Sequence, residues 1–280
     1  MPVTSHEEIA ARKRFAFGEN WQRFLSLLDE NRILSAEDSL RRMLEVPHLR
    51  GKTFLDIGCG SGLFSLAARR LGATVHCFDF DPQSVACAQE LRRRYFPEDP
   101  AWRIEQGSAL DTGYLSSLGT FDVVYSWGVL HHTGAMWQAL DNAAALVQLK
   151  GKLFIAIYND QGKISNRWRT VKRTYNRLPG GLRFLVSIPV VVHLNWRRTV
   201  KDLLRGRPLE AWRNVRKERG MSAWRDLIDW VGGYPFEVAK PESILDFYLR
   251  RGFALVRLTT CGGSLGCNEY VFLRSSAGTP

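Results

Sequence analysis

Three glycines and two aspartates are spaced as a nucleoside-binding site requires. Gly58, Gly60 and Gly62 follow an apolar stretch that ends in Asp56, and Asp79 closes the next apolar stretch 23 residues later. Glycines permit a tight turn and a close approach of ligand to backbone, and an acid after the second strand can accept hydrogen bonds from ribose hydroxyls. A glycine-rich loop alone is a weak signal, but this combination predicts a site for a nucleoside-containing ligand.

A second set of residues could move protons. His131 and His132 lie in an expected loop, where a histidine can act as a base at neutral pH, and Asp160 follows the apolar stretch that ends in Tyr158. Each has a structural alternative, because a loop histidine can brace its loop and Asp160 can cap the next helix. Both interpretations remain open from the sequence.

The elements expected to position these residues alternate along the chain. Short apolar, β-branched stretches predict strands, and the segments between them predict helices. The alternation predicts a parallel sheet covered on both faces. The expected strands are 52–57, 74–78, 102–106, 121–126, 153–158, 254–258 and 269–274, and the expected helices include 63–71, 82–94, 136–149 and 241–251.

Residues 52–158 resemble the class I S-adenosylmethionine-dependent methyltransferases. The resemblance rests on LDIGCGSG at 55–62, CFDFDP at 77–82, GSALD at 107–111, FDVVYSWGVLHHT at 121–133 and LKGKLFIAIY at 149–158. It implies an α/β, Rossmann-like fold whose seven-stranded mixed sheet has an antiparallel last strand, with an α-helical insertion after strand five. A Rossmann-like dehydrogenase is the alternative, which the GxGxG spacing and Asp56 weaken, and the GxxxxGK[ST] loop of a P-loop kinase is absent.

The resemblance also implies S-adenosylmethionine as cofactor, S-adenosylhomocysteine as product, and roles for individual residues. The glycines should flank the methionine moiety, Asp56 should contact that end of the cofactor, and Asp79 should hold both ribose hydroxyls. Ser108 and Ala109 should border adenine, and the end of the fourth strand should line the path to the substrate. The expected cofactor-binding residues are Asp56, Gly58, Cys59, Gly60, Gly62, Asp79, Phe80, Ser108, Ala109, Ser126 and Trp127.

Within this superfamily the chain is most similar to the ubiquinone-biosynthesis O-methyltransferases. Those enzymes carry two glutamates and a histidine after strand four, whereas Gly128, His131 and His132 stand here, so we expect no metal. The resemblance implies methyl transfer to a heteroatom of a small molecule, foremost a hydroxyl oxygen, with His131, His132 or Asp160 as base. The alternatives are a small thiol, a glycan or lipid precursor at a membrane, and a non-catalytic cofactor-binding partner.

Four regions are expected along the chain. They are an N-terminal helical lid (1–50), the cofactor-binding core (51–160), a basic, Trp-rich helical cap (161–231) and the rest of the core (232–280). The tentative substrate contacts are Trp21, Tyr158, Tyr234, Cys267 and Asn268.

The positive charge of the chain is concentrated in the cap. The whole chain has a net charge of +11, whereas residues 161–225 hold 17 Lys or Arg and only 3 Asp or Glu. Three partners fit this segment: an anionic or aromatic small-molecule acceptor, an anionic membrane surface beside the apolar run 184–194, or nucleic acid. No added RNA-binding module is recognisable, which disfavours nucleic acid.

Composition and cysteine usage exclude several other classes. The chain of 280 residues is 45% hydrophobic and 24% charged, as in folded globular proteins, so dominant disorder is excluded. Its five cysteines form no CxxC pair, which argues against a disulfide framework or a zinc knuckle. No signal core follows Met1, so we expect a cytoplasmic protein, with peripheral membrane association as the variant.

Overall fold

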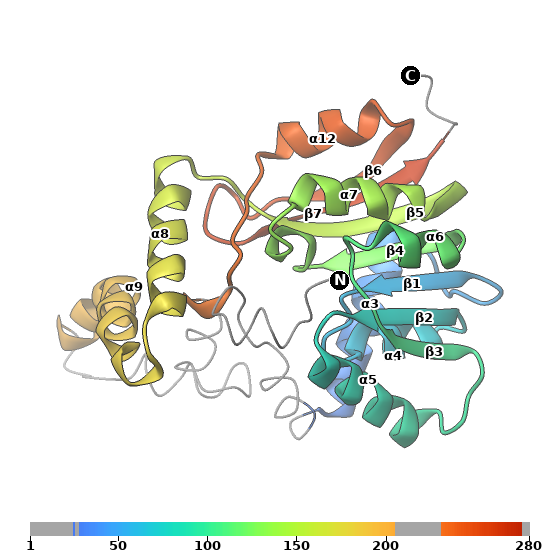
Figure 1. The fold of residues 1–280 in the computed structure, drawn as a ribbon, viewed down its shortest axis with the longest axis horizontal. Helices are drawn as coiled ribbons and strands as arrows, with labels where there is room; N and C mark the ends of the chain where they lie inside the picture. Colours follow the sequence, from blue (N-terminus) through green and yellow to red (C-terminus); the bar gives the residue numbers. More distant parts are fainter. Residues whose placement is uncertain (1–24, 26–27, 205–230, 276–280) are drawn as a thin grey trace. The chain divides into compact units, whose positions relative to one another are not determined.

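The computed structural model describes residue 25 and residues 28–204 and 231–275, which divide into two compact units (Figure 1). The core unit holds the described residues up to Ser165 and those from Phe236 onward. The insert unit holds residues 166–204 and 231–235. Each unit is described by itself below.

The core unit is built on one seven-stranded sheet with the order β3-β2-β1-β4-β5-β7-β6. Strands β1 to β5 run parallel, and β7 runs antiparallel to both β5 and β6. The strands are β1 (Thr53–Ile57), β2 (Thr74–Asp79), β3 (Trp102–Gln106), β4 (Phe121–Trp127), β5 (Val147–Tyr158), β6 (Phe253–Thr259) and β7 (Cys267–Arg274). The predicted α/β fold with its antiparallel last strand is confirmed.

Helices cover the sheet on both faces, because alternate residues of each strand point to opposite sides and both sides are apolar. One hydrophobic cluster joins the sheet to α3, α4 and α5, and the other joins it to α6, α7 and α12 (Figure 1). The helices are α3 (Glu30–Leu44), α4 (Leu63–Arg70), α5 (Pro82–Tyr95), α6 (Thr112–Ser117), α7 (Met136–Ala145) and α12 (Pro241–Leu249), and a 3-10 turn, η1 (Leu130–His132), precedes α7. Because β1, β2, β4 and β5 run parallel, the loops that follow these strands all leave the sheet at the same edge.

The boundary between α7 and β5 differs from the expectation. The sequence predicted a helix up to Leu149 and a strand from Leu153, but α7 ends at Ala145 and β5 begins at Val147. Val147 pairs with Phe121 of β4, and the strand continues through an irregularity. Gly151 makes this possible, because a Cβ there would lie 2.8 Å from the Gln148 carbonyl oxygen. The tertiary pairing with β4 therefore overrides the local helical preference.

The described part of the insert unit is helical. It contains most of α8 (Lys163–Arg177), the 3-10 turn η2 (Gly180–Leu182) and α9 (Phe184–Leu204). Trp168 and Tyr175 of α8 and Val190 and Val191 of α9 are buried. Among the described helices, none combines the length and apolar character needed to cross a membrane.

Candidate active site

The loop after β1 has the backbone that its glycines predict. Gly58, Gly60 and Gly62 have φ angles of 75°, 53° and 82°, a left-handed region that disfavours other residues. A Cβ on Gly58 would lie 2.3 Å from Val129 Cγ1, and one on Gly62 would lie 2.9 Å from the Cα of Ala88. The glycines thus bring the β1 loop against the loop after β4 on one side and against α5 on the other.

Asp79, at the end of β2, is oriented by two backbone donors. The Gly60 N–H donates to Asp79 Oδ2 over 2.9 Å, and the Asp81 N–H donates to Asp79 Oδ1 over 2.9 Å. Asp81 in turn caps α5 by accepting from the Gln83 N–H. Asp79 is only partly buried, so its carboxylate stands at the edge of the glycine loop with its direction set.

Asp56 lies beneath the loop rather than at its surface. It is 2% exposed, and the Ser65 hydroxyl on α4 donates to its Oδ2 over 2.6 Å. Burial raises the pKa of Asp56 to about 7, even though the Ser65 hydrogen bond acts in the opposite direction. In this structure Asp56 ties the end of β1 to the first turns of α4. Cys59, the loop residue beside Gly58, is buried.

The loop after β3 meets the same edge. The Gly107 N–H donates to the Asp79 carbonyl over 3.0 Å, which fixes this loop beside the end of β2. Ser108 Oγ accepts from the Leu110 N–H over 3.2 Å, and the Ala109 carbonyl accepts from Asn142 Nδ2 on α7 over 2.8 Å. Phe80, like Ser108 and Ala109, is partly exposed. The expected ribose and adenine residues therefore come from adjoining loops.

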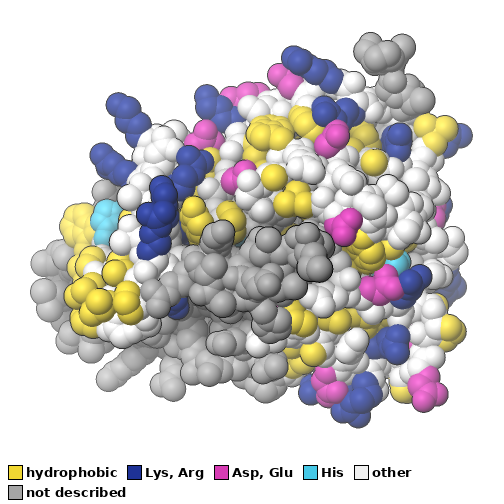
Figure 2. All heavy atoms as spheres, viewed as in Figure 1, with side chains coloured by type: hydrophobic (Ala, Val, Ile, Leu, Met, Phe, Trp, Pro, Cys, Tyr) yellow, Lys and Arg dark blue, Asp and Glu magenta, His cyan; other side chains and the backbone are white. Residues whose placement is uncertain are grey.

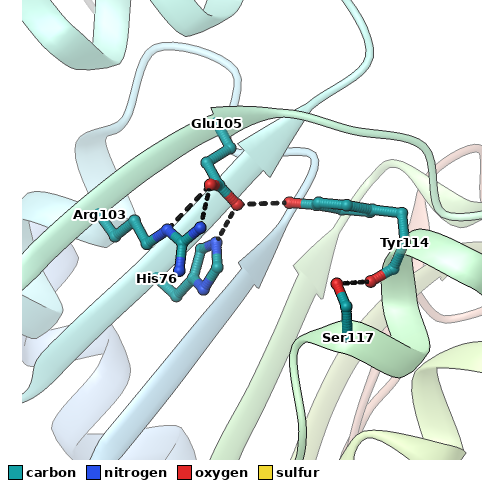
Figure 3. Close-up of polar contacts among 5 residues, drawn as sticks. All are labelled: His76, Arg103, Glu105, Tyr114 and Ser117. Carbon is teal, nitrogen blue, oxygen red and sulfur yellow. Dashed lines mark hydrogen bonds and ion pairs between the residues drawn. The ribbon is translucent and has the colours of Figure 1, made fainter.

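A polar cluster behind this loop went unnoticed in the sequence (Figure 3). Glu105 Oε2 accepts from Tyr114 Oη over 3.1 Å and lies 2.9 Å from His76 Nε2, while Glu105 Oε1 accepts from Arg103 Nε over 2.8 Å. Burial alone would raise the pKa of Glu105, but the bonds from Arg103 and His76 hold it below its usual value. Burial lowers the pKa of His76, so the His76–Glu105 contact is a hydrogen bond of a neutral imidazole at neutral pH.

This cluster positions the Tyr114 ring under the loop. A Cβ on Gly107 would lie 2.3 Å from Tyr114 Cε1, and the Tyr114 ring packs edge-on against Phe78 at 5.3 Å between centroids. The signal in the sequence was that His76 and Phe78 alternate along β2, as Arg103 and Glu105 do along β3. Only the register of the two strands shows which of these residues lie side by side.

Side chains at the end of β4 form hydrogen bonds to its neighbour β1 and to β7, which lies beyond β5 in the sheet. The buried Ser126 hydroxyl donates to the Ile57 carbonyl of β1 over 2.9 Å, and Trp127 Nε1 donates to Glu269 Oε1 of β7 over 2.7 Å. Trp127 is nevertheless 45% exposed. Its indole is therefore an exposed apolar surface held in place by one hydrogen bond.

The two histidines form an aromatic cluster with Tyr158. The His131 ring lies 4.1 Å from the Tyr158 ring and 4.5 Å from the His132 ring, between centroids, and Phe236 packs on Tyr158 at 5.4 Å. His131 is fully buried and His132 is 8% exposed. Of the two, only His132 retains any solvent-exposed surface.

Glu237 supports the same region and was also missed from the sequence. Its backbone N–H donates to the His131 carbonyl over 3.0 Å, and its carboxylate accepts from the Met136 N–H at the start of α7 over 3.0 Å. The residue at the N-cap position, Ala135, has no side chain that could do this. A remote glutamate therefore replaces the local cap, which no reading of adjacent residues reveals.

A polar pocket of about 690 Å³ opens beside the end of β5. Asp160 and Asn268 line it, and Asp160 Oδ1 accepts from the Gly162 N–H over 2.8 Å, as in an Asx turn. Buried Asn268 donates through Nδ2 to Asn159 Oδ1 over 3.1 Å. Burial raises the pKa of the neighbouring Cys267 thiol to about 12, and both Cys261 and Cys267 are free thiols.

The remaining expected residues fall elsewhere. Trp21 and the rest of the expected N-terminal aromatic lid lie outside the described residues. Tyr234 is half-buried and belongs to the insert unit. Within residues 28–204 and 231–275, no three His, Cys, Asp or Glu side chains are grouped to hold a metal ion.

The sheet order and the two loops at its edge define the class I fold of the S-adenosylmethionine-dependent methyltransferases. Residues 55–153 match the family described as "Methyltransferase domain". A magnesium protoporphyrin IX methyltransferase from Synechocystis PCC 6803, solved with bound S-adenosylhomocysteine, aligns with a TM-score of 0.51 and 16% identity, over 87% of this chain and 83% of that one. An O-methyltransferase family protein from Burkholderia thailandensis aligns with a TM-score of 0.55 and 15% identity, over 99% of this chain and 64% of that one.

Among curated proteins, one relative is the tRNA U34 carboxymethyltransferase of Azotobacter vinelandii, which is 42% identical over 90 residues. The alignment covers 31% of this chain and 27% of that protein. The chain thus spans about a quarter of the length of this relative, and the likeness concerns the shared domain.

Proposed function

We propose that this protein transfers a methyl group from S-adenosylmethionine to a heteroatom of a small molecule, with a hydroxyl oxygen as the foremost acceptor. The observation that carries the proposal is the pairing of the glycine loop with Asp79, whose carboxylate is aimed by the Gly60 N–H over 2.9 Å. The methyltransferase family of residues 55–153 supports the same assignment.

The residues at this edge fit the cofactor. Gly58 and Gly62 allow the tight turn after β1 to pack against Val129 and Ala88, and Asp79 is partly exposed with an orientation suited to two vicinal hydroxyls. The loop carrying Ser108 and Ala109 lies beside Asp79 through the Gly107–Asp79 hydrogen bond, as adenine next to its ribose requires.

Little chemistry is required of the protein itself. When bound, the sulfonium cofactor supplies an already activated methyl group, so the protein must hold the acceptor in line at about 3–3.5 Å and exclude water. Trp127, exposed but hydrogen-bonded to Glu269, offers an apolar wall for this purpose. A hydroxyl acceptor also needs a base, and in this proposal His132 receives its proton while Tyr158 and His131 hold the imidazole by ring packing.

A thiol acceptor is the nearest variant, because thiols ionise near neutral pH and need less help from a base. A tRNA acceptor is a second candidate. The likeness to the tRNA U34 carboxymethyltransferase of Azotobacter vinelandii and the basic character of residues 161–225 both favour it. We also propose the division into the four regions expected from the sequence, in which the basic insertion is the cap that covers the substrate.

Two measurements on the full chain test the proposal. Calorimetry with S-adenosylmethionine should show binding, and release of S-adenosylhomocysteine should be stimulated by one class within a panel of phenols, sugars, thiols and unmodified tRNA. Binding without turnover on any acceptor would favour the non-catalytic partner. Binding of a nicotinamide dinucleotide in place of S-adenosylmethionine would overturn the assignment.

A further inference from the structure

The outer face of α9 is apolar, which is the reverse of the usual arrangement for a surface helix. Phe184, Leu185, Ile188, Val192 and Trp196 are each between 50% and 59% exposed. Their spacing of mainly four residues places them within one third of the helix circumference. Ser187, Val190 and Val191 are buried on the other side of the helix.

α9 and the residue before it contact α8 within the insert unit. Trp168 and Tyr175 of α8 are buried as well, and the Trp168 ring lies 6.4 Å from the ring of His193. Arg183, just before α9, stacks on the Tyr175 ring at 5.2 Å. The exposed apolar residues are therefore not a misplaced core face, because α9 already has a packed side.

The insert unit that carries this apolar face is strongly basic. Residues 166–204 hold nine Lys or Arg and a single Asp. Arg167, Arg169, Arg173 and Arg177 on α8 are exposed, and in Figure 2 hydrophobic side chains gather over α9 while Lys and Arg side chains gather over α8. Arg197 and Arg198 follow Trp196 directly in the sequence.

We propose that α9 docks on the surface of an anionic lipid bilayer, with Phe184, Ile188, Val192 and Trp196 buried at the level of the acyl chains and the exposed arginines of α8 attracted to the headgroups. An apolar stripe that includes a Trp, on a unit rich in Arg, suits the interface, where apolar burial and attraction to anionic lipid act together. Nucleic acid would use the arginines but would leave four adjacent aliphatic and aromatic side chains unexplained. A second copy of the chain would bring the same positive charge to the contact, which disfavours self-association.

The test is sedimentation of the full chain with vesicles of phosphatidylcholine, alone or mixed with phosphatidylglycerol. The protein should pellet with the mixed vesicles, and the pelleted fraction should fall as salt is raised. The double substitution Ile188→Glu with Val192→Glu should weaken binding at least tenfold. Its matched control is Leu149→Glu with Leu265→Glu, which changes two exposed leucines of the core unit and the net charge by the same amount, and should bind as wild type does.

Insertion has a second readout that does not depend on these substitutions. Brominated phosphatidylcholine in the anionic vesicles should quench tryptophan fluorescence, and Trp196→Phe should remove that quenching. Failure to pellet with anionic vesicles would overturn the proposal. So would an equal loss of vesicle binding in Leu149→Glu with Leu265→Glu, or undiminished binding of Ile188→Glu with Val192→Glu. A dimer that forms without lipid and that the substitutions in α9 abolish would also overturn it. The outcome is separable from the proposed function, because neither measurement involves the cofactor or methyl transfer.

Discussion

The backbone N–H of Gly60 donates to Asp79 Oδ2 over 2.9 Å, which couples the loop after β1 to the acid that ends β2. A carboxylate held this way does not need to reorganise when it accepts hydrogen bonds from a ligand. The coupling also means that changes in either loop should affect the same binding event.

Replacing Asp79 by Ala should therefore weaken binding of S-adenosylhomocysteine by about 1–3 kcal/mol, because polar ligand groups and the Gly60 N–H lose their partner. Titration calorimetry measures this directly. Asp141→Ala is the control, since this exposed acid of α7 pairs with Arg251 and belongs to neither of the two coupled loops. An unchanged affinity in Asp79→Ala would remove the ribose assignment.

Gly58→Ala should disrupt the loop, because the added Cβ would lie 2.3 Å from Val129 Cγ1. Gly119→Ala is a matched control: Gly119 has the same φ of +75° but open space around it. The control should cost about 1 kcal/mol of unfolding free energy from backbone strain alone. Gly58→Ala should cost clearly more in chemical denaturation and should also weaken cofactor binding. Equal costs at both sites would contradict the close approach of the two loops.

The histidine cluster makes a kinetic prediction. Once an acceptor is known, His132→Ala should lower turnover about 10²-fold, because a general base contributes on this order. Affinity for S-adenosylhomocysteine should stay unchanged. His131→Ala should also lower turnover, by removing the ring that packs on both Tyr158 and His132. The exposed His48 serves as control, and His48→Ala should have wild-type turnover. Wild-type rates in both cluster variants would point to an acceptor that needs no base.

The stability of the protein should depend on pH through Asp56. Its pKa is about 7 in the folded state against an ordinary value of 3.8, so between these values the unfolded chain is ionised while the folded chain is not. Folding stability should therefore fall as pH rises from about 4 to about 7 and then level off.

Asp56→Asn isolates this effect, because the amide oxygen can still accept from Ser65 Oγ. Between pH 5 and pH 8 the unfolding free energy of the wild type should fall because Asp56 titrates, and that of the variant should not. The difference between variant and wild type should therefore grow by about 2 kcal/mol over this range. Urea denaturation at several pH values measures this. A constant difference between the two proteins across that range would show that Asp56 does not titrate there.

Glu237→Ala should uncap α7, since the Met136 N–H would lose the carboxylate that accepts from it over 3.0 Å. Loss of a helix cap costs about 1 kcal/mol. Thermal unfolding should show a lower midpoint for this variant, whereas Asp246→Ala, at an exposed site on α12, should leave the midpoint nearly unchanged. Equal midpoints for the two variants would contradict the capping role.

Much of the fold follows from local patterns. The strand that carries Asp56, the strand that ends in Asp79 and the glycines between them could be predicted because strand periodicity and turn chemistry act over a few residues. The start of β5 could not be predicted. Its partner, Phe121, lies far from it in the sequence. Pairing with Phe121 extends the strand back to Val147, over residues with helical character.

The residue types of the site follow from the sequence, because a nucleoside needs glycine backbone and a carboxylate at defined strand ends, and such spacing is visible along the chain. The tertiary structure alone decided which groups meet: Glu105 with His76 and Tyr114, Glu237 with the start of α7, and the apolar side of α9 that faces outward. These contacts join residues whose separation along the chain carries no signal. Strand register, remote capping and the choice of which helix face is buried are settled by packing, and packing is a property of the whole chain.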